Sequence, residues 1–151
     1  MDNSNSLKIL ALIPARMGSS RFPGKPMELI NSKPMIGHVY HQVKKNKQLN
    51  DVAIATCDEI IYNYIVSIEG KAIMTSNKHE RASERCAEAL MIIEKKEKIK
   101  YDIVVMVQGD EPLVHPNMIT EAIQPMINDS EILVTNLLGK IENKSEFEDF
   151  N

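Results

Sequence analysis

The sequence lacks the features that would place the protein in a membrane or in an oxidising compartment. No apolar run approaches the length of a membrane-spanning helix, and the short polar N-terminus has no signal-peptide core. Two cysteines, Cys57 and Cys86, are too few for a disulfide framework or a metal-ligand cluster, and indicate buried thiols in a reducing compartment. The formal net charge of −3 gives no general attraction for nucleic acids or anionic membranes. We therefore expect a soluble, cytoplasmic protein without a nucleic-acid or membrane partner.

Internal repeats and low-complexity segments are also absent, and the 151 residues suffice for one domain with a core. Because the chain is slightly acidic on average, a local cluster of cations is informative. Residues 13–26 (IPARMGSSRFPGKP) carry Arg16, Arg21 and Lys25 but no acid, together with two glycines, two serines and three prolines. A loop of this composition exposes backbone N–H groups and concentrates positive charge, which suits a polyphosphate.

Apolar runs typical of strands alternate with stretches of helical periodicity along the chain. The predicted strands are residues 7–13, 51–56, 71–74, 101–107 and 132–138. The helices between them carry apolar stripes; one follows Asp58 as N-cap and stops at Gly70, and another starts near Pro116. This alternation predicts an α/β fold, with a mostly parallel Rossmann-like sheet between two layers of helices.

Ligands of such sheets bind beyond the carboxyl ends of the strands, where the strand order reverses. The first and fourth strands would flank that point, and the cationic loop and residues 108–112 (QGDEP) follow them. Lys25 with Arg16 or Arg21 could hold phosphate oxygens, while Asp110 could bind Mg²⁺ through its carboxylate. The loop has neither P-loop spacing nor the glycine spacing of a dinucleotide fingerprint.

Several motifs together resemble one family. They are residues 13–16 (IPAR), 20–21 (SR), 23–26 (PGKP), 33–36 (KPMI), 38–40 (HVY) and 107–112 (VQGDEP). In type, spacing and order these resemble the CMP-Kdo synthetases, which are 3-deoxy-manno-octulosonate cytidylyltransferases within the wider group of CMP-sugar-acid synthetases. The resemblance covers most of residues 8–136 and implies a nucleotidyltransferase sheet.

The resemblance implies that the anomeric hydroxyl of a 2-keto sugar acid, Kdo or a related one, attacks the α-phosphorus of CTP and releases pyrophosphate. The product would be a precursor of lipopolysaccharide or another surface glycan. By the same resemblance, Asp110 binds Mg²⁺ and is catalytic together with Lys25 and Arg16, and Gln108 faces the sugar. The other residues expected to bind substrate are Ser20, Arg21, Ser83 and Arg85, together with the backbone around Leu12, Pro14 and Ala15, which we expect to select the base. The implied partners are CTP and the sugar acid, and the full-length form is expected to be a homodimer.

The chain departs from the family pattern in two places. Residues 79–85 (HERASER) replace a family serine and glycine by Arg81 and Ala82, and Arg81 could pair with a substrate carboxylate or point to solvent. Members of the family also continue well beyond the position of Asn151. We therefore expect residues 1–151 to be the CTP-binding part of a single domain whose C-terminal part is missing. Two alternatives stay open: a truncated, non-catalytic CTP-binding fragment, and a nucleotidyltransferase for another sugar.

Overall fold

Four parallel strands form the central sheet of the protein, for which a computed structural model describes residues 7–18 and 22–139. The strands lie in the order β5-β4-β1-β6, and every neighbouring pair is parallel. Their bounds are β1 Ile9–Ala15, β4 Asp51–Thr56, β5 Lys71–Met74 and β6 Ile103–Met106. The chain adds strands on one side of β1 and then crosses to the other side. The switch point therefore lies between β1 and β6, as the sequence predicted.

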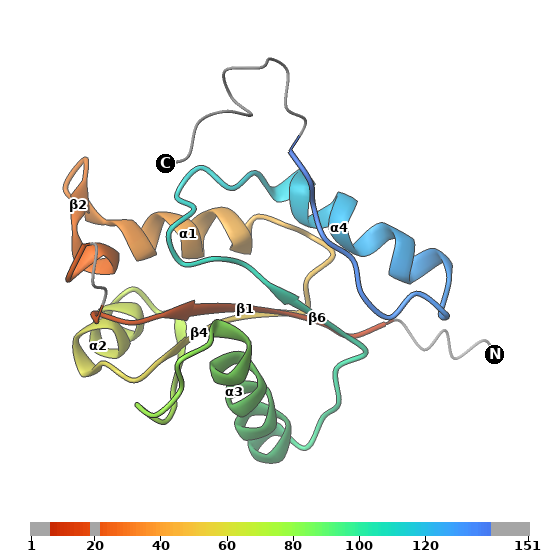
Figure 1. The fold of residues 1–151 in the computed structure, drawn as a ribbon, viewed down its shortest axis with the longest axis horizontal. Coiled ribbons are helices and arrows are strands. Elements are labelled where there is room, and N and C mark those ends of the chain that lie inside the picture. The colour runs from red at the N-terminus through yellow and green to blue at the C-terminus, as the bar shows by residue number, and fades with distance from the viewer. Residues whose placement is uncertain (1–6, 19–21, 140–151) are drawn as a thin grey trace.

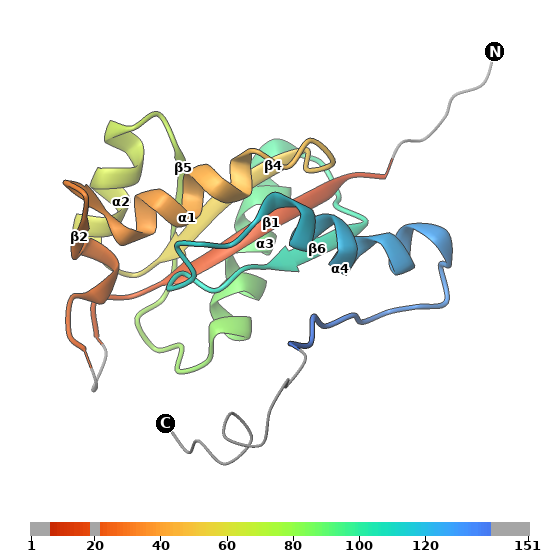
Figure 2. The same ribbon diagram turned by 90° about the horizontal axis from the view of Figure 1, so that it is seen from above.

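Four α-helices cover the sheet and make it the middle of three layers, which confirms the α/β prediction. They are α1 Met35–Lys44, α2 Glu59–Ser67, α3 Ala82–Glu97 and α4 Pro116–Asn128. Figure 1 shows α1 and α4 on one side of the sheet and α3 on the other, and Figure 2 shows α1 and α4 from above, over the strands. Helix α1 connects β1 to β4 and α2 connects β4 to β5, both in the same direction across the sheet. Helix α3 connects β5 to β6 in the opposite direction. A right-handed crossover therefore places α3 on the other face.

The first strand is buried along its whole length, and its side chains alternate between two cores. Ala11 and Ile13 pack with α1 and α2, whereas Leu10 and Leu12 pack against α3. Since helices cover both faces, a parallel strand of this kind reads as a continuous apolar run rather than an alternating one. That is the pattern from which the strand was predicted.

Between the first strand and α1, the chain forms a short 3₁₀ turn and a small hairpin. The turn η1 spans Lys25–Met27, and β2 (Leu29–Ile30) pairs in antiparallel fashion with β3 (Lys33–Pro34). Gly24 precedes the turn with a φ of 79°, a conformation that glycine adopts without steric cost. The turn holds Lys25 in place at the end of the cationic loop.

The strand β1 extends two residues further than the sequence indicated and includes Pro14 and Ala15. Pairing with β4 continues to Ala15, opposite Thr56, but pairing with β6 ends at Leu12. At Pro14, therefore, β1 pairs with β4 alone. A proline, which has no N–H to donate to a second neighbouring strand, is tolerated there as on an edge strand.

The prediction of a fifth strand over residues 132–138 is wrong, because these residues form no strand in the structure. The segment runs beside α4, where the Thr135 hydroxyl donates a hydrogen bond to the carbonyl of Ala122 at 2.6 Å. Leu133, Val134 and Leu138 are 77–93% exposed. Their apolar pattern is typical of a strand, but a strand forms only where a partner edge and a surface to pack on are present.

Both cysteines are free thiols, as expected, although Cys57 is half-buried rather than buried. Cys86 lies on the buried face of α3, and burial raises the pKa of its thiol to about 11. Among the described helices, none is long and apolar enough to cross a membrane.

Candidate functional site

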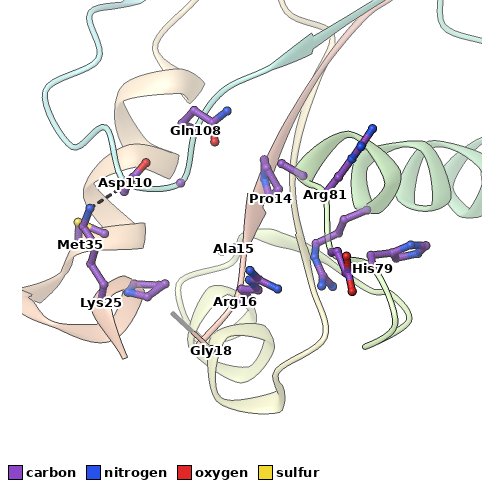
Figure 3. Close-up of a pocket in the computed structure, with 15 residues that line it drawn as sticks. Pro14, Ala15, Arg16, Gly18, Lys25, Met35, His79, Arg81, Gln108 and Asp110 are labelled. Atoms are coloured by element: carbon purple, nitrogen blue, oxygen red, sulfur yellow. Dashed lines mark hydrogen bonds and ion pairs between the residues drawn. The ribbon is translucent and has the colours of Figure 1, made fainter. Parts of the chain in front are cut away.

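A pocket of about 330 Å³ opens at the carboxyl ends of β1 and β6, beside the N-terminus of α3 (Figure 3). Its position is the switch point of the sheet, where open α/β folds bind their ligands. It is lined by Pro14, Ala15, Arg16, Gly18, Lys25, Pro26, Met35, His79, Glu80, Arg81, Ala82, Arg85, Gln108, Gly109 and Asp110. Lys25 and Asp110 lie on one side, and His79 and Arg81 on the other, with Pro14 and Ala15 between them.

The ion pair between Lys25 and Asp110 joins the cationic loop to the acidic loop across the switch point. The Lys25 ammonium donates to a carboxylate oxygen of Asp110 at 2.8 Å, and the side chains are 37% and 49% exposed. The expectation that these two loops lie side by side is thus confirmed. Because water reaches both groups, the pair contributes little to stability, and either partner can exchange the other for a ligand.

Close backbone contact also holds the two loops together. A Cβ atom on Gly109 would lie 2.5 Å from the carbonyl oxygen of Pro14, well inside the contact distance of the two atoms. A glycine is therefore required between Gln108 and Asp110 for the acidic loop to approach the end of β1 this closely.

On the opposite wall, Arg85 is a buried cation with neutral partners. Its residue is 3% exposed, and one guanidinium nitrogen donates to the Thr75 hydroxyl at 2.6 Å and to the carbonyl of Ser76 at 3.3 Å. Within residues 7–18 and 22–139, no carboxylate forms an ion pair with it. Glu88 is near enough for Arg85 to help lower its pKa but does not contact it, so an anionic ligand in the pocket would be a direct partner for this arginine.

Beside Arg85, His79 is held by Glu88. The imidazole Nε2 and the Glu88 carboxylate are 2.5 Å apart, and the same carboxylate oxygen accepts the N–H of Ser76 at 2.8 Å. The Ser76 amide and then His79 lower the pKa of Glu88 from its ordinary value of 4.5. Glu88 therefore stays ionised and fixes the loop that brings His79 to the pocket.

Most of the residues predicted for the site do line this pocket. Those that line it are Pro14, Ala15, Arg16, Lys25, Arg85, Gln108 and Asp110. Leu12 does not: its side chain lies in the core against α3, and its carbonyl accepts the N–H of Val107 at 3.0 Å. Ser83 is exposed on α3 and is not part of the lining. Ser20 and Arg21 fall outside the described residues.

Sequence reasoning assigned no role in the site to several of the lining residues. They are Gly18, Pro26, Met35, His79, Glu80, Ala82 and Gly109; for Arg81 the sequence left open a pairing with a substrate carboxylate or a place in solvent, and the structure puts it in the lining. Pro26, Met35 and Gly109 stand inside the quoted motifs, so their place in those motifs was an available signal. Residues 79–82 stand outside those motifs, so the sequence indicated them less clearly. They follow a short strand, and only the folded sheet brings them to the pocket.

A family model for cytidylyltransferases matches residues 10–151, so the chain belongs to the cytidylyltransferase family. Among its relatives, the 3-deoxy-manno-octulosonate cytidylyltransferase of Geotalea daltonii is 42% identical over 141 residues. That of Parabacteroides distasonis is 39% identical over 142 residues. These alignments cover 93% and 94% of this chain but 53% and 54% of the relatives, so the chain spans about half their length.

Solved structures agree with the family assignment. The structure of CMP:2-keto-3-deoxy-manno-octonic acid synthetase complexed with CTP has a TM-score of 0.71 and 39% sequence identity. The similarity covers 82% of this chain and 48% of that chain. A 4-diphosphocytidyl-2C-methyl-D-erythritol synthase, with a TM-score of 0.65 and 14% identity over 90% of this chain and 64% of that one, shares the fold alone.

Proposed function

We propose that the protein is a cytidylyltransferase that activates Kdo, or a closely related 2-keto sugar acid, with CTP to give the CMP-sugar and pyrophosphate. The observation that carries this proposal is the pocket itself, which joins Lys25, Asp110 and Arg85 at the switch point. Family membership supports the CTP half of the reaction, and the names of the relatives support the sugar acid. A cytoplasmic location and a homodimer remain expectations from the sequence.

In the proposed reaction the anomeric oxygen of the sugar acid bonds to the α-phosphorus, and the bond from that phosphorus to the bridging oxygen breaks. The hydroxyl proton goes to solvent, and pyrophosphate leaves. Lys25 and Arg16 bind the phosphate oxygens and stabilise the charge that develops on them. Arg85 supplies the positive charge for the carboxylate of the sugar acid, since its guanidinium has neutral partners within the protein.

The Asp110 carboxylate fits the requirements of Mg²⁺, which prefers oxygen ligands and takes one or two carboxylates beside substrate phosphates. It is about half exposed at the pocket, next to the lysine proposed to hold the phosphates. No cluster of three or more potential metal ligands occurs in the described part of the chain; in the proposed site, Asp110 would hold the ion together with phosphate oxygens and water. Bound Mg²⁺ would neutralise phosphate charge.

The proposal is tested by measuring pyrophosphate release from CTP and Mg²⁺ with a panel of 2-keto sugar acids, and by repeating the assay with UTP and GTP. We expect release with CTP and an eight-carbon sugar acid, and rates at least about tenfold lower with the other nucleotides, because one good polar contact to a base discriminates by that much. Calorimetric titration of the 151-residue chain with CTP and Mg²⁺ tests the nucleotide half separately. If CTP neither binds nor turns over with any sugar acid, the proposal is wrong.

A further inference from the structure

A connected polar network lies beneath the pocket and includes residues that do not line it. Of the four polar or charged residues that are buried in the described part of the chain, three belong to this network: Thr56, Thr75 and Arg85. Thr56 has no exposed surface at all. Buried polar groups need hydrogen-bond partners, and a fully satisfied network of this kind makes a site rigid.

One end of the network holds the cationic loop. The Asp58 carboxylate, just before α2, accepts a hydrogen bond from the backbone N–H of Met17 at 2.8 Å. Asp58 does not line the pocket, whereas Arg16 and Gly18, the neighbours of Met17, both do. Asp58 stands at the N-cap of α2, yet its side chain makes no capping bond to that helix. The carboxylate is therefore committed to the loop rather than to its own helix.

Thr56 connects Asp58 to the other wall of the pocket. Its hydroxyl accepts the N–H of Asp58 at 3.1 Å, and its carbonyl accepts both the N–H and the hydroxyl of Thr75 at 2.8 and 3.0 Å. Thr75 in turn accepts the guanidinium of Arg85. A chain of hydrogen bonds thus runs across the ends of β1, β4 and β5, from the loop that carries Arg16 to Arg85.

We propose that Asp58 is a positioning residue for nucleotide binding. Its bond to the Met17 amide, supported by the hydrogen bond from its own N–H to Thr56, fixes the position of the Arg16–Gly18 segment relative to Arg85 on the opposite side of the pocket. Nothing in the proposal requires Asp58 to touch the nucleotide. The inference rests on the proposed function, because it assigns the phosphates of CTP to the loop that Asp58 holds.

The test compares Asp58→Ser with Asp58→Asn. Serine keeps a favourable N-cap residue for α2 but is too short to reach Met17, whereas the asparagine oxygen can still accept the amide. We expect Asp58→Ser to weaken CTP binding, measured by calorimetry, by about tenfold or more, which is what losing a hydrogen bond to a charged acceptor costs. Asp58→Asn should restore most of the affinity. A role in folding alone would not produce this order.

Asp102 provides the matched control, since its carboxylate accepts the backbone N–H of Lys8 at 2.7 Å and neither residue lines the pocket. Asp102→Ser removes the same kind of bond and should leave CTP affinity unchanged. A readout that needs no nucleotide is hydrogen exchange of the Met17 amide in the free protein. It should be faster in Asp58→Ser and unchanged in Asp102→Ser.

The outcomes separate the two proposals. If wild-type protein does not bind CTP, the proposed function fails, and the exchange of the Met17 amide still decides whether Asp58 holds the loop. The positioning role is refuted if Asp58→Ser binds CTP with wild-type affinity. It is also refuted if Asp58→Asn binds CTP as weakly as Asp58→Ser does. Should Asp58→Ser not fold, Thr56→Val removes the hydroxyl that accepts the Asp58 N–H, and unchanged Met17 exchange in that variant would equally refute the proposal.

Discussion

At the scale of single residues, Lys25 and Arg85 stand in contrasting environments. Lys25 is partly exposed and paired with Asp110, whereas Arg85 is buried with neutral hydrogen-bond partners. An exposed ion pair adds little to stability, so the value of Lys25 lies in where it places a charge. A buried cation that no carboxylate contacts directly is costly, and a bound anion lowers that cost.

Lys25→Ala should lower kcat/KM for CTP by about 10²-fold or more, because it removes a charge aimed at the reacting phosphates. Its effect on the melting temperature should be small, since the lost ion pair is partly solvated. Initial rates of pyrophosphate release and a thermal melt measure the two effects. Lys100→Ala is the control: Lys100 pairs with Glu94 outside the pocket, and its loss should leave the rate unchanged.

Glu88→Gln tests the loop that carries His79. Because the pKa of Glu88 is lower in the folded protein than its ordinary 4.5, its stabilising effect is fully present above that value and disappears as the pH falls through the lowered pKa. We expect Glu88→Gln to melt below wild type at about pH 6, and this difference in melting temperature to shrink as the pH is lowered below 4.5. A difference in melting temperature that stays constant as the pH is lowered below 4.5 would contradict this assignment.

At the scale of elements, the four strands that pair in the central sheet were all predicted as strands. The predicted strands at β4 and β5 have the observed bounds, since short apolar runs between turn residues mark buried parallel strands. The run over residues 132–138 has the same character but follows α4 without pairing. Strand formation depends on a neighbouring edge, which local sequence does not encode.

Gly109→Ala tests the approach of the acidic loop to β1. The added methyl group would lie 2.5 Å from the Pro14 carbonyl, so the loop must move away and carry Asp110 with it. We expect a loss of about 1–3 kcal/mol, typical of overpacking, and a melting temperature lower by roughly 2–12 °C. Gly139→Ala has nothing within 4 Å of the new atom and serves as the control. Equal melting temperatures for the two variants would rule out the close approach.

At the scale of the whole molecule, the reversal of strand order brings the pocket together from segments far apart in the chain. Lys25 and Asp110 are 85 residues apart in the sequence, and α3 adds Ala82 and Arg85 to the lining of the pocket. Loops after β1 and β6 meet here because these two strands are neighbours with their carboxyl ends on the same edge. The pocket therefore forms only when the sheet is complete through β6.

Binding of CTP with Mg²⁺ should stabilise the folded molecule, because the unfolded chain does not assemble this pocket. At a free concentration of about 100 times Kd, linkage gives about 2.7 kcal/mol, or a rise in melting temperature of roughly 5–11 °C. Thermal melts with CTP, UTP and GTP measure the shift and its selectivity. Asp110→Asn should lose the part of the shift that depends on Mg²⁺; a shift equal to that of wild type would exclude Asp110 as its ligand.

The sequence by itself determined the alternating α/β order, the two loops at the switch point, and the motifs that place the chain among the cytidylyltransferases. These are properties of local composition and spacing, which short windows of sequence carry. The tertiary structure alone decided that residues 132–138 do not pair and that the Asp58 carboxylate bonds to the Met17 amide. The bond between Asp58 and Met17 joins residues 41 positions apart. It depends on strand register and helix placement, which exist only once the chain has folded.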